Sequence, residues 1–224
     1  MFFDFHVHND NELVREAERL GYNGVALFNR AENEINKSVL PDNDPSFQIK
    51  SGLAVHPKNT ADLKRKIQKH RMKTDVLMVN GGDLKINRAA CENPQVDILS
   101  NPYWRRRDCG INHISARKAA ENDVAVELNT KYLLNIKPQL RYKILGYYRE
   151  ILKLQRKFDF PLIITSGADS IFDLHTPPDL IALTYCFGMT EEEAFIALSE
   201  TPRDIIIKNS VRGHMLVEGA KIID

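Results

Sequence analysis

Hydrophobic positions along the chain follow two alternating spacings, one typical of β-strands and one typical of α-helices. Seven short apolar runs predict strands at residues 2–7, 24–28, 48–55, 75–80, 97–100, 124–129 and 162–166. Between them, apolar residues recur every three to four positions and predict helices at residues 11–20, 61–69, 113–122 and 138–158. A further helix is expected to begin at the capping box formed by Thr190 and Glu193 and to end at Thr201-Pro202.

This order of strands and helices predicts an α/β fold with a parallel sheet and right-handed crossovers. About seven strand–helix repeats favour a TIM-barrel-like (βα) barrel, and no glycine-rich fingerprint follows the first strand to suggest a Rossmann domain. We find no internal repeat or linker, so residues 1–224 are expected to form a single α/β barrel domain. Residues 31–46 are polar and contain Pro41 and Pro45, which predicts one long surface loop.

Charge, hydropathy and cysteine content narrow the classes of function. The formal net charge is only +1, so a nucleic-acid-binding protein of this composition needs a local basic surface. No apolar run reaches the length of a membrane span, and the first residues do not form a secretory leader, so we expect neither. Cys91, Cys109 and Cys186 form no C-x-x-C pair, which predicts reduced thiols and a cytoplasmic protein.

A pair of histidines marks the end of the first predicted strand. His6 and His8 are two residues apart, so their side chains should project to the same side at the end where barrels build active sites. Two imidazoles in this arrangement are a plausible metal pair. The segment is similar to the first motif of the PHP phosphoesterase family, which has His-x-His at this place. That resemblance implies further ligands, for which His56 and His113 are the candidates.

The remainder of the PHP pattern is incomplete in this chain. The family has an Asp-x-His motif near the last strand, but no histidine stands two positions after Asp169. A catalytic metal site needs at least three protein ligands. Two interpretations therefore remain: His6 and His8 are a vestigial metal site, or, in the alternative function, they form the centre of a metal-dependent PHP-type phosphoesterase.

A basic triplet, Arg105-Arg106-Arg107, follows the strand predicted at 97–100 and stands next to Tyr103 and Trp104. Guanidinium groups bind phosphate oxygens and stack on unpaired bases, and aromatic rings provide further stacking partners. The triplet therefore indicates an RNA-binding loop. The alternatives are that the arginines form a solvated loop tip and that the aromatic pair caps the barrel core.

Other basic residues form two smaller groups. Arg88, Arg117 and Lys118 are expected on neighbouring loops or helix starts at the same end of the barrel as the triplet. A second cluster surrounds the helix predicted at 61–69, where the bland interpretation, a solvated helix face, is favoured. Its members are Lys58, Lys64, Arg65, Lys66, Lys69, His70 and Arg71.

A longer pattern covers nearly the whole chain. In chain order its motifs include Lys69-His70-Arg71, Gly81-Gly82-Asp83, Asn87-Arg88-Ala89-Ala90, Val96-Asp97-Ile98-Leu99-Ser100, Gly110-Ile111-Asn112-His113, Ala119-Ala120-Glu121-Asn122 and Gly188-Met189-Thr190. Together they resemble the ribonuclease P protein component 3 family of archaea. The chain departs from that family at Asn101, where a histidine is frequent, and at His175, where an arginine is frequent.

This resemblance implies a subunit of ribonuclease P, the endoribonuclease that removes the 5′ leader of precursor tRNA with an RNA as its catalyst. Implied partners are ribonuclease P RNA, protein component 2, other protein subunits and, for the holoenzyme, precursor tRNA. Mg²⁺ is implied for the RNA-catalysed reaction, and no catalytic residue is expected in this chain. RNA binding is expected at Arg88, Arg105, Arg106, Arg107, His113 and Lys118.

Overall fold

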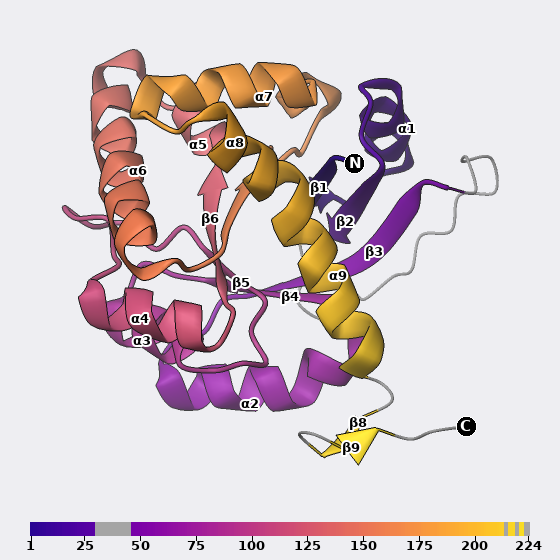
Figure 1. Ribbon diagram of the computed structural model, residues 1–224, viewed down its shortest axis with the longest axis vertical. Helices are drawn as coiled ribbons and strands as arrows, with labels where there is room; N and C mark the ends of the chain where they lie inside the picture. Colours follow the sequence, from indigo (N-terminus) through magenta and orange to yellow (C-terminus); the bar gives the residue numbers. More distant parts are fainter. Residues whose placement is uncertain (30–45, 213–214, 218–219, 222–224) are drawn as a thin grey trace.

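Seven parallel strands form one sheet that curls into a nearly closed barrel surrounded by helices (Figure 1). The computed structural model describes residues 1–29, 46–212, 215–217 and 220–221, so the loop predicted at 31–46 lies, apart from its last residue, outside the described residues. Each strand pairs with its neighbour in sequence, which confirms the predicted TIM-barrel-like α/β fold. The strands are β1 (Phe3–His8), β2 (Gly24–Phe28), β3 (Gln48–Val55), β4 (Val76–Asn80), β5 (Ile98–Ser100), β6 (Ala125–Asn129) and β7 (Leu162–Thr165).

Helices follow most of the strands and pack against the outer face of the barrel (Figure 1). In the described part of the chain they are α1 (Asn11–Arg19), α2 (Thr60–His70), α3 (Leu84–Cys91), α4 (His113–Glu121), α5 (Thr130–Leu134), α6 (Pro138–Phe158), α7 (Pro177–Thr184), α8 (Glu191–Phe195) and α9 (Thr201–Arg212). Short helical turns lie at η1 (Arg71–Lys73), η2 (Ile171–Asp173), η3 (Tyr185–Phe187) and η4 (Ile196–Glu200), and β8 (Met215–Val217) pairs with β9 (Ala220–Lys221). The predicted helices α1, α2, α4 and α6 are confirmed.

Side-chain caps fix where the first four helices begin. Asp10, Asn59, Asp83 and Asn112 each accept a backbone N–H from the first turn of α1, α2, α3 and α4 respectively. These N–H groups have no partner within the helix, so a carboxylate or amide oxygen at this position stabilises the helix start. All four caps lie beyond the carboxyl ends of strands, and they therefore hold the loops at that end, the mouth of the barrel, in defined positions.

Apolar side chains fill the barrel below its mouth. The inner cluster consists of Phe3, Phe5, Ala26, Phe28, Val76, Met78, Ile98, Ala125, Ile163 and Ile205. Gly52 makes room for the ring of Phe28, since a Cβ at that position would lie 2.5 Å from the ring. A larger apolar cluster packs the outer strand faces against the helices. Because the interior is filled, a ligand of this barrel has to bind at its mouth or on its outer surface.

The barrel closes between β7 and β1 with little strand pairing. A single parallel bridge joins Val7 to Ala168, and the His8 N–H donates to the Ala168 carbonyl at 2.8 Å. Nearer the start of β1, the buried carboxylate of Asp4 accepts the Ser166 N–H at 3.2 and 3.3 Å. Burial raises the pKa of Asp4, although its hydrogen bonds to Ser166 and His6 lower it in part. A side chain therefore supplies the closing contact that an eighth strand provides in a complete barrel.

The prediction that a helix ends at Thr201-Pro202 is wrong. The chain passes from α8 through η4 into α9 without leaving helical geometry. A proline ring clashes with the carbonyl four residues earlier in an α-helix, but η4 is a π-turn in which the Thr201 N–H donates to Ile196. A π-turn widens the helix locally, which accommodates Pro202.

Helix α9 covers the end of the barrel opposite to the mouth. Ile205 joins the inner apolar cluster. The Lys208 ammonium donates to the Asn122 and Asp123 carbonyls at 3.3 and 3.0 Å, and the Asn209 amide donates to the Asp75 carbonyl at 2.7 Å. These carbonyls lie just before β6 and β4, so α9 is fixed across the ends where the strands begin.

Two further expectations concern thiols and membranes. Cys91, Cys109 and Cys186 are all free, and burial raises the pKa of Cys91 to about 12 and of Cys109 to about 11. The two buried thiols are therefore unreactive packing residues. In the described ranges, every helix is too short or too polar to cross a bilayer.

A buried ion pair joins η1, which follows α2, to the residue just before β5. The Arg71 guanidinium donates to the Asp97 carboxylate at 2.7 Å, and the Leu77 N–H donates to the same oxygen at 2.8 Å. Arg71 and His70, both expected on a solvated helix face, are instead buried, because the chain turns inward at η1. Burial raises the pKa of Asp97, and the charge of Arg71 offsets part of that rise.

Asp97→Ala is expected to lower the free energy of unfolding by about 3–5 kcal/mol, because Arg71 would keep a buried charge without its counter-ion. Urea unfolding monitored by circular dichroism measures the loss. Glu92→Ala, which removes the partner of Arg88 in an exposed pair, is the matched control and should change stability by less than about 1 kcal/mol. Equal losses for the two variants would contradict a structural role for Asp97.

Candidate functional site

A polar cleft of about 180 Å³ lies at the barrel mouth and is lined by residues at or after the carboxyl ends of six strands, all but β6, and by Tyr132 on α5. Its polar walls include His6, His8, His56, Asn80, Asn101 and Asp169. The first two come from β1, and the others stand at or just after the ends of β3, β4, β5 and β7. The prediction that His6 and His8 share one side of the barrel is confirmed.

An irregularity in β1 turns His6 toward the barrel axis. The pairing of β1 with β2 shifts register between Asp4 and Val7. Phe5 packs in the inner apolar cluster, yet the next side chain, His6, also faces inward, while Val7 packs outside against α1. Such a bulge redirects side chains at strand ends.

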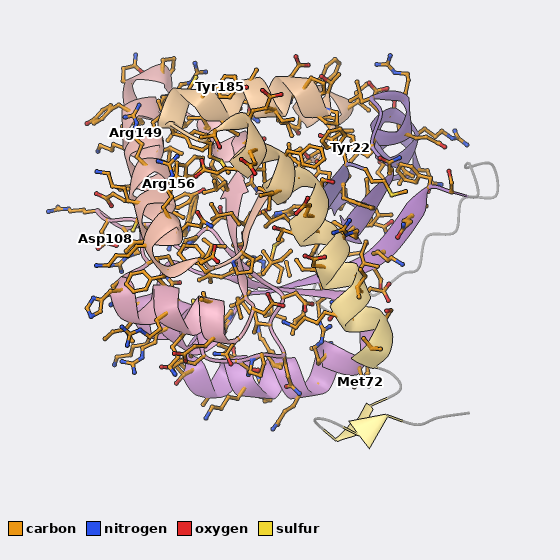
Figure 2. All side chains as sticks on the ribbon, in the orientation of Figure 1. Tyr22, Met72, Asp108, Arg149, Arg156 and Tyr185 are labelled. Carbon is orange, nitrogen blue, oxygen red and sulfur yellow. The ribbon has the colours of Figure 1, made fainter. Side chains whose placement is uncertain are left out.

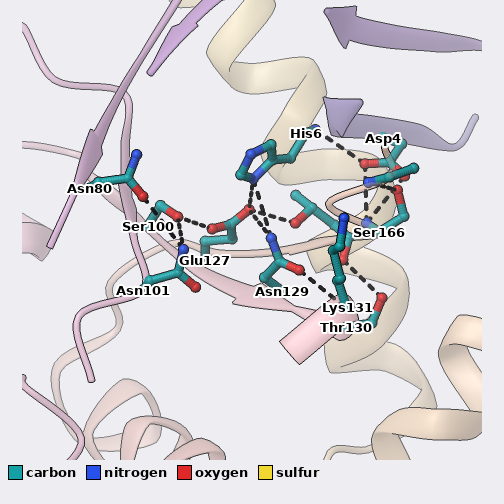
Figure 3. A network of polar contacts seen from close by, with 12 residues as sticks. Asp4, His6, Asn80, Ser100, Asn101, Glu127, Asn129, Thr130, Lys131 and Ser166 are labelled. Atoms are coloured by element: carbon teal, nitrogen blue, oxygen red, sulfur yellow. Dashed lines mark hydrogen bonds and ion pairs between the residues drawn. The ribbon is translucent and has the colours of Figure 1, made fainter. Parts of the chain in front are cut away.

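Glu127 on β6 gathers hydrogen bonds from four elements at this mouth (Figure 3). It is fully buried, and its carboxylate accepts from His6 Nδ1 at 2.5 Å, Thr165 Oγ1 at 2.6 Å and Asn129 Nδ2 at 3.3 Å. The Ser100 hydroxyl donates to its second oxygen. Both oxygens are thus engaged by protein donors, which is the condition for keeping a carboxylate buried.

His6 and Glu127 shift each other's pKa, and each shift favours the charged form. Burial opposes a charge on His6, but the nearby Glu127 charge and hydrogen bond outweigh it and raise the pKa of His6. Burial likewise acts to raise the pKa of Glu127, but the charge of His6 and the hydrogen bonds from His6, Ser100 and Thr165 lower it.

Two of the other candidate metal ligands, His8 and His56, line the same cleft as His6, but the ring of each contacts a protein group. His8 Nδ1 lies 3.1 Å from the Phe28 carbonyl, and His56 Nε2 lies 3.2 Å from the Asn80 amide. His113 is the first residue of α4 and does not line the cleft. Within the described ranges, no group of three or more His, Cys, Asp and Glu side chains is arranged to hold a metal ion. The geometry therefore gives the phosphoesterase alternative no ligand set there.

A chain of hydrogen bonds connects Glu127 to the loop that follows β5, residues 101–112, which we call the arginine loop. The Asn101 amide donates to the Ser100 hydroxyl at 2.8 Å, and the Tyr103 hydroxyl donates to Asn101 at 3.2 Å. The hydroxyls of Tyr103 and Tyr148 are 3.0 Å apart. The first turn of the arginine loop is therefore anchored to the centre of the barrel.

Asn87 on α3 clamps the arginine loop from a second side. Its buried side chain donates to the carbonyls of Pro102 and Gly110, both at 2.9 Å, and accepts the Gly82 N–H at 2.9 Å. Gly110 has φ +73°, and a Cβ there would lie 1.9 Å from the Pro102 oxygen, so glycine is required. The sequence places Asn87 in a motif, but its role is visible only in the structure.

The three arginines of the triplet have different environments. Arg106 forms a two-bond pair with Asp108, with both distances 2.7 Å, and its carbonyl accepts from Tyr147 at 3.0 Å. The guanidinium of Arg106 lowers the pKa of Asp108. Arg105 and Arg107 are exposed, and neither has an ion pair with another described residue. Asp108 itself lies at the edge of the molecule beside α4 and α6 (Figure 2).

The two aromatic residues beside the triplet also differ. Tyr103 is only 3% exposed and packs on Tyr147 and Tyr148, so the interpretation that it caps the core is confirmed. Trp104 is 46% exposed, and its ring centroid lies 5.4 Å from that of Tyr132 on α5. Only Trp104 of this pair is available to a ligand.

The remaining predicted RNA-binding residues lie on α3 and α4, which pack side by side (Figure 1). Arg88 is exposed in the middle of α3 and pairs with Glu92 at 2.7 Å. Lys118 on α4 pairs with Glu121 at 2.6 Å, while His113 is exposed at the start of that helix. Contact of these residues with RNA stays a prediction.

Comparison with known proteins gives matches over nearly the whole chain. The family model described as RNase P subunit p30 matches residues 1–214. Ribonuclease P protein component 3 of Methanothermobacter thermautotrophicus is 42% identical over 233 residues, which cover 99% of this chain and 95% of that protein. The protein of the same description from Methanococcoides burtonii is 37% identical over 230 residues, covering 100% and 94%.

Solved structures agree with these sequence matches. One chain in a cryo-EM structure of archaeal ribonuclease P with mature tRNA superposes with a TM-score of 0.82 at 30% identity, covering 99% of this chain and 98% of that one. Histidinol phosphate phosphatase from Lactococcus lactis, solved with zinc, has a TM-score of 0.51 at 13% identity and covers 93% of both chains. The second likeness concerns the fold alone.

Glu127→Gln is expected to lower the free energy of unfolding by about 3 kcal/mol, because the amide nitrogen cannot accept from the donors that now surround the carboxylate. Urea unfolding measures the change. Glu121→Gln, at the exposed pair with Lys118, is the matched control and should be close to neutral. An unaltered stability of Glu127→Gln would refute the central position given to this carboxylate.

Asn87→Ala is expected to loosen the arginine loop and to cost about 2–3 kcal/mol, since three hydrogen bonds are lost. Hydrogen exchange followed by mass spectrometry should show that residues 102–110 exchange faster in Asn87→Ala than in the unmodified chain, while exchange in the strands changes less. Asn93→Ala, which removes one exposed bond to the Gln95 N–H, is the control. Equal exchange of this segment in both variants would show that Asn87 does not hold the loop.

Proposed function

The chain belongs to the RNase P subunit p30 family, and from this we propose that it is a protein subunit of archaeal ribonuclease P. The observation that carries the proposal is the 30% identical match, over nearly the full length of both chains, to a chain of a solved archaeal ribonuclease P. A metal-dependent phosphoesterase is not favoured, because the described residues contain no group of three or more His, Cys, Asp or Glu side chains arranged to hold a metal ion.

In this function the chain supports catalysis by the RNA and performs no chemical step itself. The buried carboxylate of Glu127 is engaged on both oxygens by protein donors and is not free to act as a base. The contribution of the chain is electrostatic: cations on its surface reduce the repulsion between crowded phosphates. Mg²⁺ would serve the RNA-catalysed reaction, and less of it would be needed when the protein is bound.

The arginine loop supplies the leading RNA contacts. Arg105 and Arg107 are exposed and free to bind phosphate, whereas Arg106 shapes the loop through Asp108 and contributes mainly its position. Of the predicted triplet, Arg105 and Arg107 are therefore the two residues that we assign to phosphate binding.

The proposed RNA-binding surface extends from the arginine loop along α3 and α4, where it includes Arg88, Lys118 and His113. Within the described residues, Arg88 pairs with the exposed Glu92 just after α3, Lys118 pairs with the exposed Glu121 on α4, and His113 is exposed at the start of α4. Because such surface pairs stabilise a protein by at most about 1 kcal/mol, both cations can exchange a carboxylate for an RNA phosphate. The surface is basic locally although the chain as a whole carries a net charge of only +1.

The proposed partners follow from the same family. They are ribonuclease P RNA, protein component 2 and other protein subunits, with precursor tRNA as the substrate of the assembled enzyme. A barrel closed at one end by α9 leaves its outer helices available for these contacts.

The double variant Arg105→Ala/Arg107→Ala is expected to weaken binding to ribonuclease P RNA. It should also reduce the slope of the logarithm of the binding constant against the logarithm of the salt concentration by about 1–2, because binding releases fewer counterions when phosphate contacts are lost. Filter binding over a range of KCl concentrations measures both quantities. The matched control is Arg15→Ala/Arg19→Ala on α1, which removes the same charge across the barrel from α3 and α4 (Figure 1).

The same proteins are then assayed for 5′ leader removal with ribonuclease P RNA and component 2 at low Mg²⁺. The unmodified chain and the α1 control should stimulate cleavage, and the arginine-loop variant should stimulate it less. An absence of stimulation by the unmodified chain would sink the proposed function. An equal salt slope for the two double variants would remove the arginine loop from the RNA surface.

A further inference from the structure

A second cleft of about 490 Å³ adjoins the polar cleft at the barrel mouth. Both clefts are lined by His6, Tyr132 and Asp169, so they form one continuous depression. The second cleft differs in that its lining is mostly apolar and includes Trp104 and Ile136. Its volume lies within the range of about 300–1,000 Å³ found for small-ligand pockets.

Two aromatic rings form the walls of this second cleft. Trp104 and Tyr132 are tilted by 60° with ring centroids 5.4 Å apart, and the tryptophan is 46% exposed. The backbone of Trp104 is fixed by its N–H bond to the Asn101 carbonyl at 3.0 Å and by close packing on Gly82, where a Cβ would lie 2.8 Å from the Trp104 oxygen. The protein therefore holds a large aromatic side chain in place while leaving nearly half of it exposed.

Polar groups stand at one edge of the aromatic walls. The Lys131 ammonium is held by Asp169 at 2.5 Å, and the Asn135 amide nitrogen donates to Asp173 at 3.0 Å. The amide oxygen of Asn135 has no hydrogen bond with another described residue and is available as an acceptor. An aromatic face with donors and acceptors at its edge is the combination that recognises an unstacked nucleobase.

Charge identifies the kind of molecule that would supply the base. Arg105 directly follows Trp104 in the chain, and Arg107 lies two residues further on. Both are exposed and lack an ion pair with any described residue, so cations adjoin the aromatic wall in sequence. A nucleotide within a strand carries phosphates on both sides of its base, which fits this neighbourhood better than an uncharged ligand does.

We propose that this cleft binds one unpaired nucleotide of an RNA strand, with its base stacked on the exposed face of Trp104 and Tyr132 as the second wall. The inference rests on the proposed function, because it assumes that the chain contacts RNA. It adds a binding site for a base to a surface otherwise described by phosphate contacts, and it gives the barrel mouth, which has no metal-ligand set in the described ranges, a ligand of its own.

The chain contains a single tryptophan, so its fluorescence reports on this cleft alone. The full-length protein is titrated with single-stranded hexa-adenylate, with an RNA duplex of equal phosphate number and with adenosine 5′-monophosphate. Hexa-adenylate should quench the fluorescence and the duplex should not, because paired bases do not present a free face. Quenching by the duplex at equal concentration would overturn the proposal. Quenching by the mononucleotide as tight as by hexa-adenylate would also overturn it, since the cleft would then serve free nucleotides.

Two substitutions test the second wall without removing the reporter. Tyr132→Ala and Tyr132→Leu should each weaken hexa-adenylate binding roughly tenfold, because an aromatic face is lost while Leu keeps apolar volume in place. The control is Tyr185→Ala, at an exposed aromatic near α7 and far from Asp108 (Figure 2). Unchanged affinity of a Tyr132→Leu protein whose thermal unfolding matches that of the unmodified chain would refute the stacking site.

Salt dependence separates this inference from the proposed function. Stacking involves no counterion release, so Tyr132→Leu should weaken binding of ribonuclease P RNA at every salt concentration without altering the slope, whereas Arg105→Ala/Arg107→Ala should reduce the slope. If the arginine variant behaves as expected and hexa-adenylate leaves the fluorescence unchanged, the nucleotide site is wrong and the basic surface stands. If hexa-adenylate quenches and the arginine variant has no effect, the site stands and the arginine loop is not the phosphate-binding surface.

Discussion

Glu127 lies fully buried at the barrel mouth, and its two oxygens bring together donors from β1, β5, β6 and β7. A buried carboxylate is tolerated only when its hydrogen bonds are complete, so these donors have to keep their positions. This requirement fixes the relative placement of strands that the backbone alone closes incompletely, since β7 meets β1 at one bridge and through Asp4. The polar centre of the mouth therefore holds the barrel in shape as well as occupying the place of an active site.

The geometry of the arginine loop is fixed by its hydrogen-bond connection to Glu127. Ser100 links Glu127 to Asn101, Asn101 is bonded to Tyr103, and Tyr103 lies against Tyr148 inside the core. The same loop is clamped from α3 by Asn87. Two independent anchors thus determine which side chains of the loop face inward and which face solvent, and the distribution of charge on the outside follows from hydrogen bonds made inside.

Sequence reasoning succeeded where the relevant signal is local or periodic. Alternating apolar residues marked all seven barrel strands, and amphipathic spacing marked the longer helices, because burial acts on every second or every third to fourth residue. It missed α3, α5 and α7, which have eight residues or fewer and leave little periodicity to detect. It also ended the last helix at Pro202, because a π-turn leaves no recognisable pattern in the sequence.

The candidate site was predictable only in part, for a related reason. The spacing of His6 and His8 places them together, but the partner of His6 lies 121 residues further along the chain and belongs to a different strand. The basic triplet identifies a charged loop, yet the difference between Arg106 and its neighbours depends on how Asp108 folds back. Tyr103 and Trp104 are adjacent in sequence, but the turn that separates one into the core and the other into solvent is set by long-range contacts with Asn87.

The anchoring of the arginine loop by Asn87 and by the hydrogen bonds from Ser100 to Tyr103 also affects the rate at which the protein can associate with a partner. A loop that is already ordered in the free protein loses little conformational entropy on meeting its partner, so encounter is governed by diffusion and electrostatic steering, with no slow folding step between collision and capture.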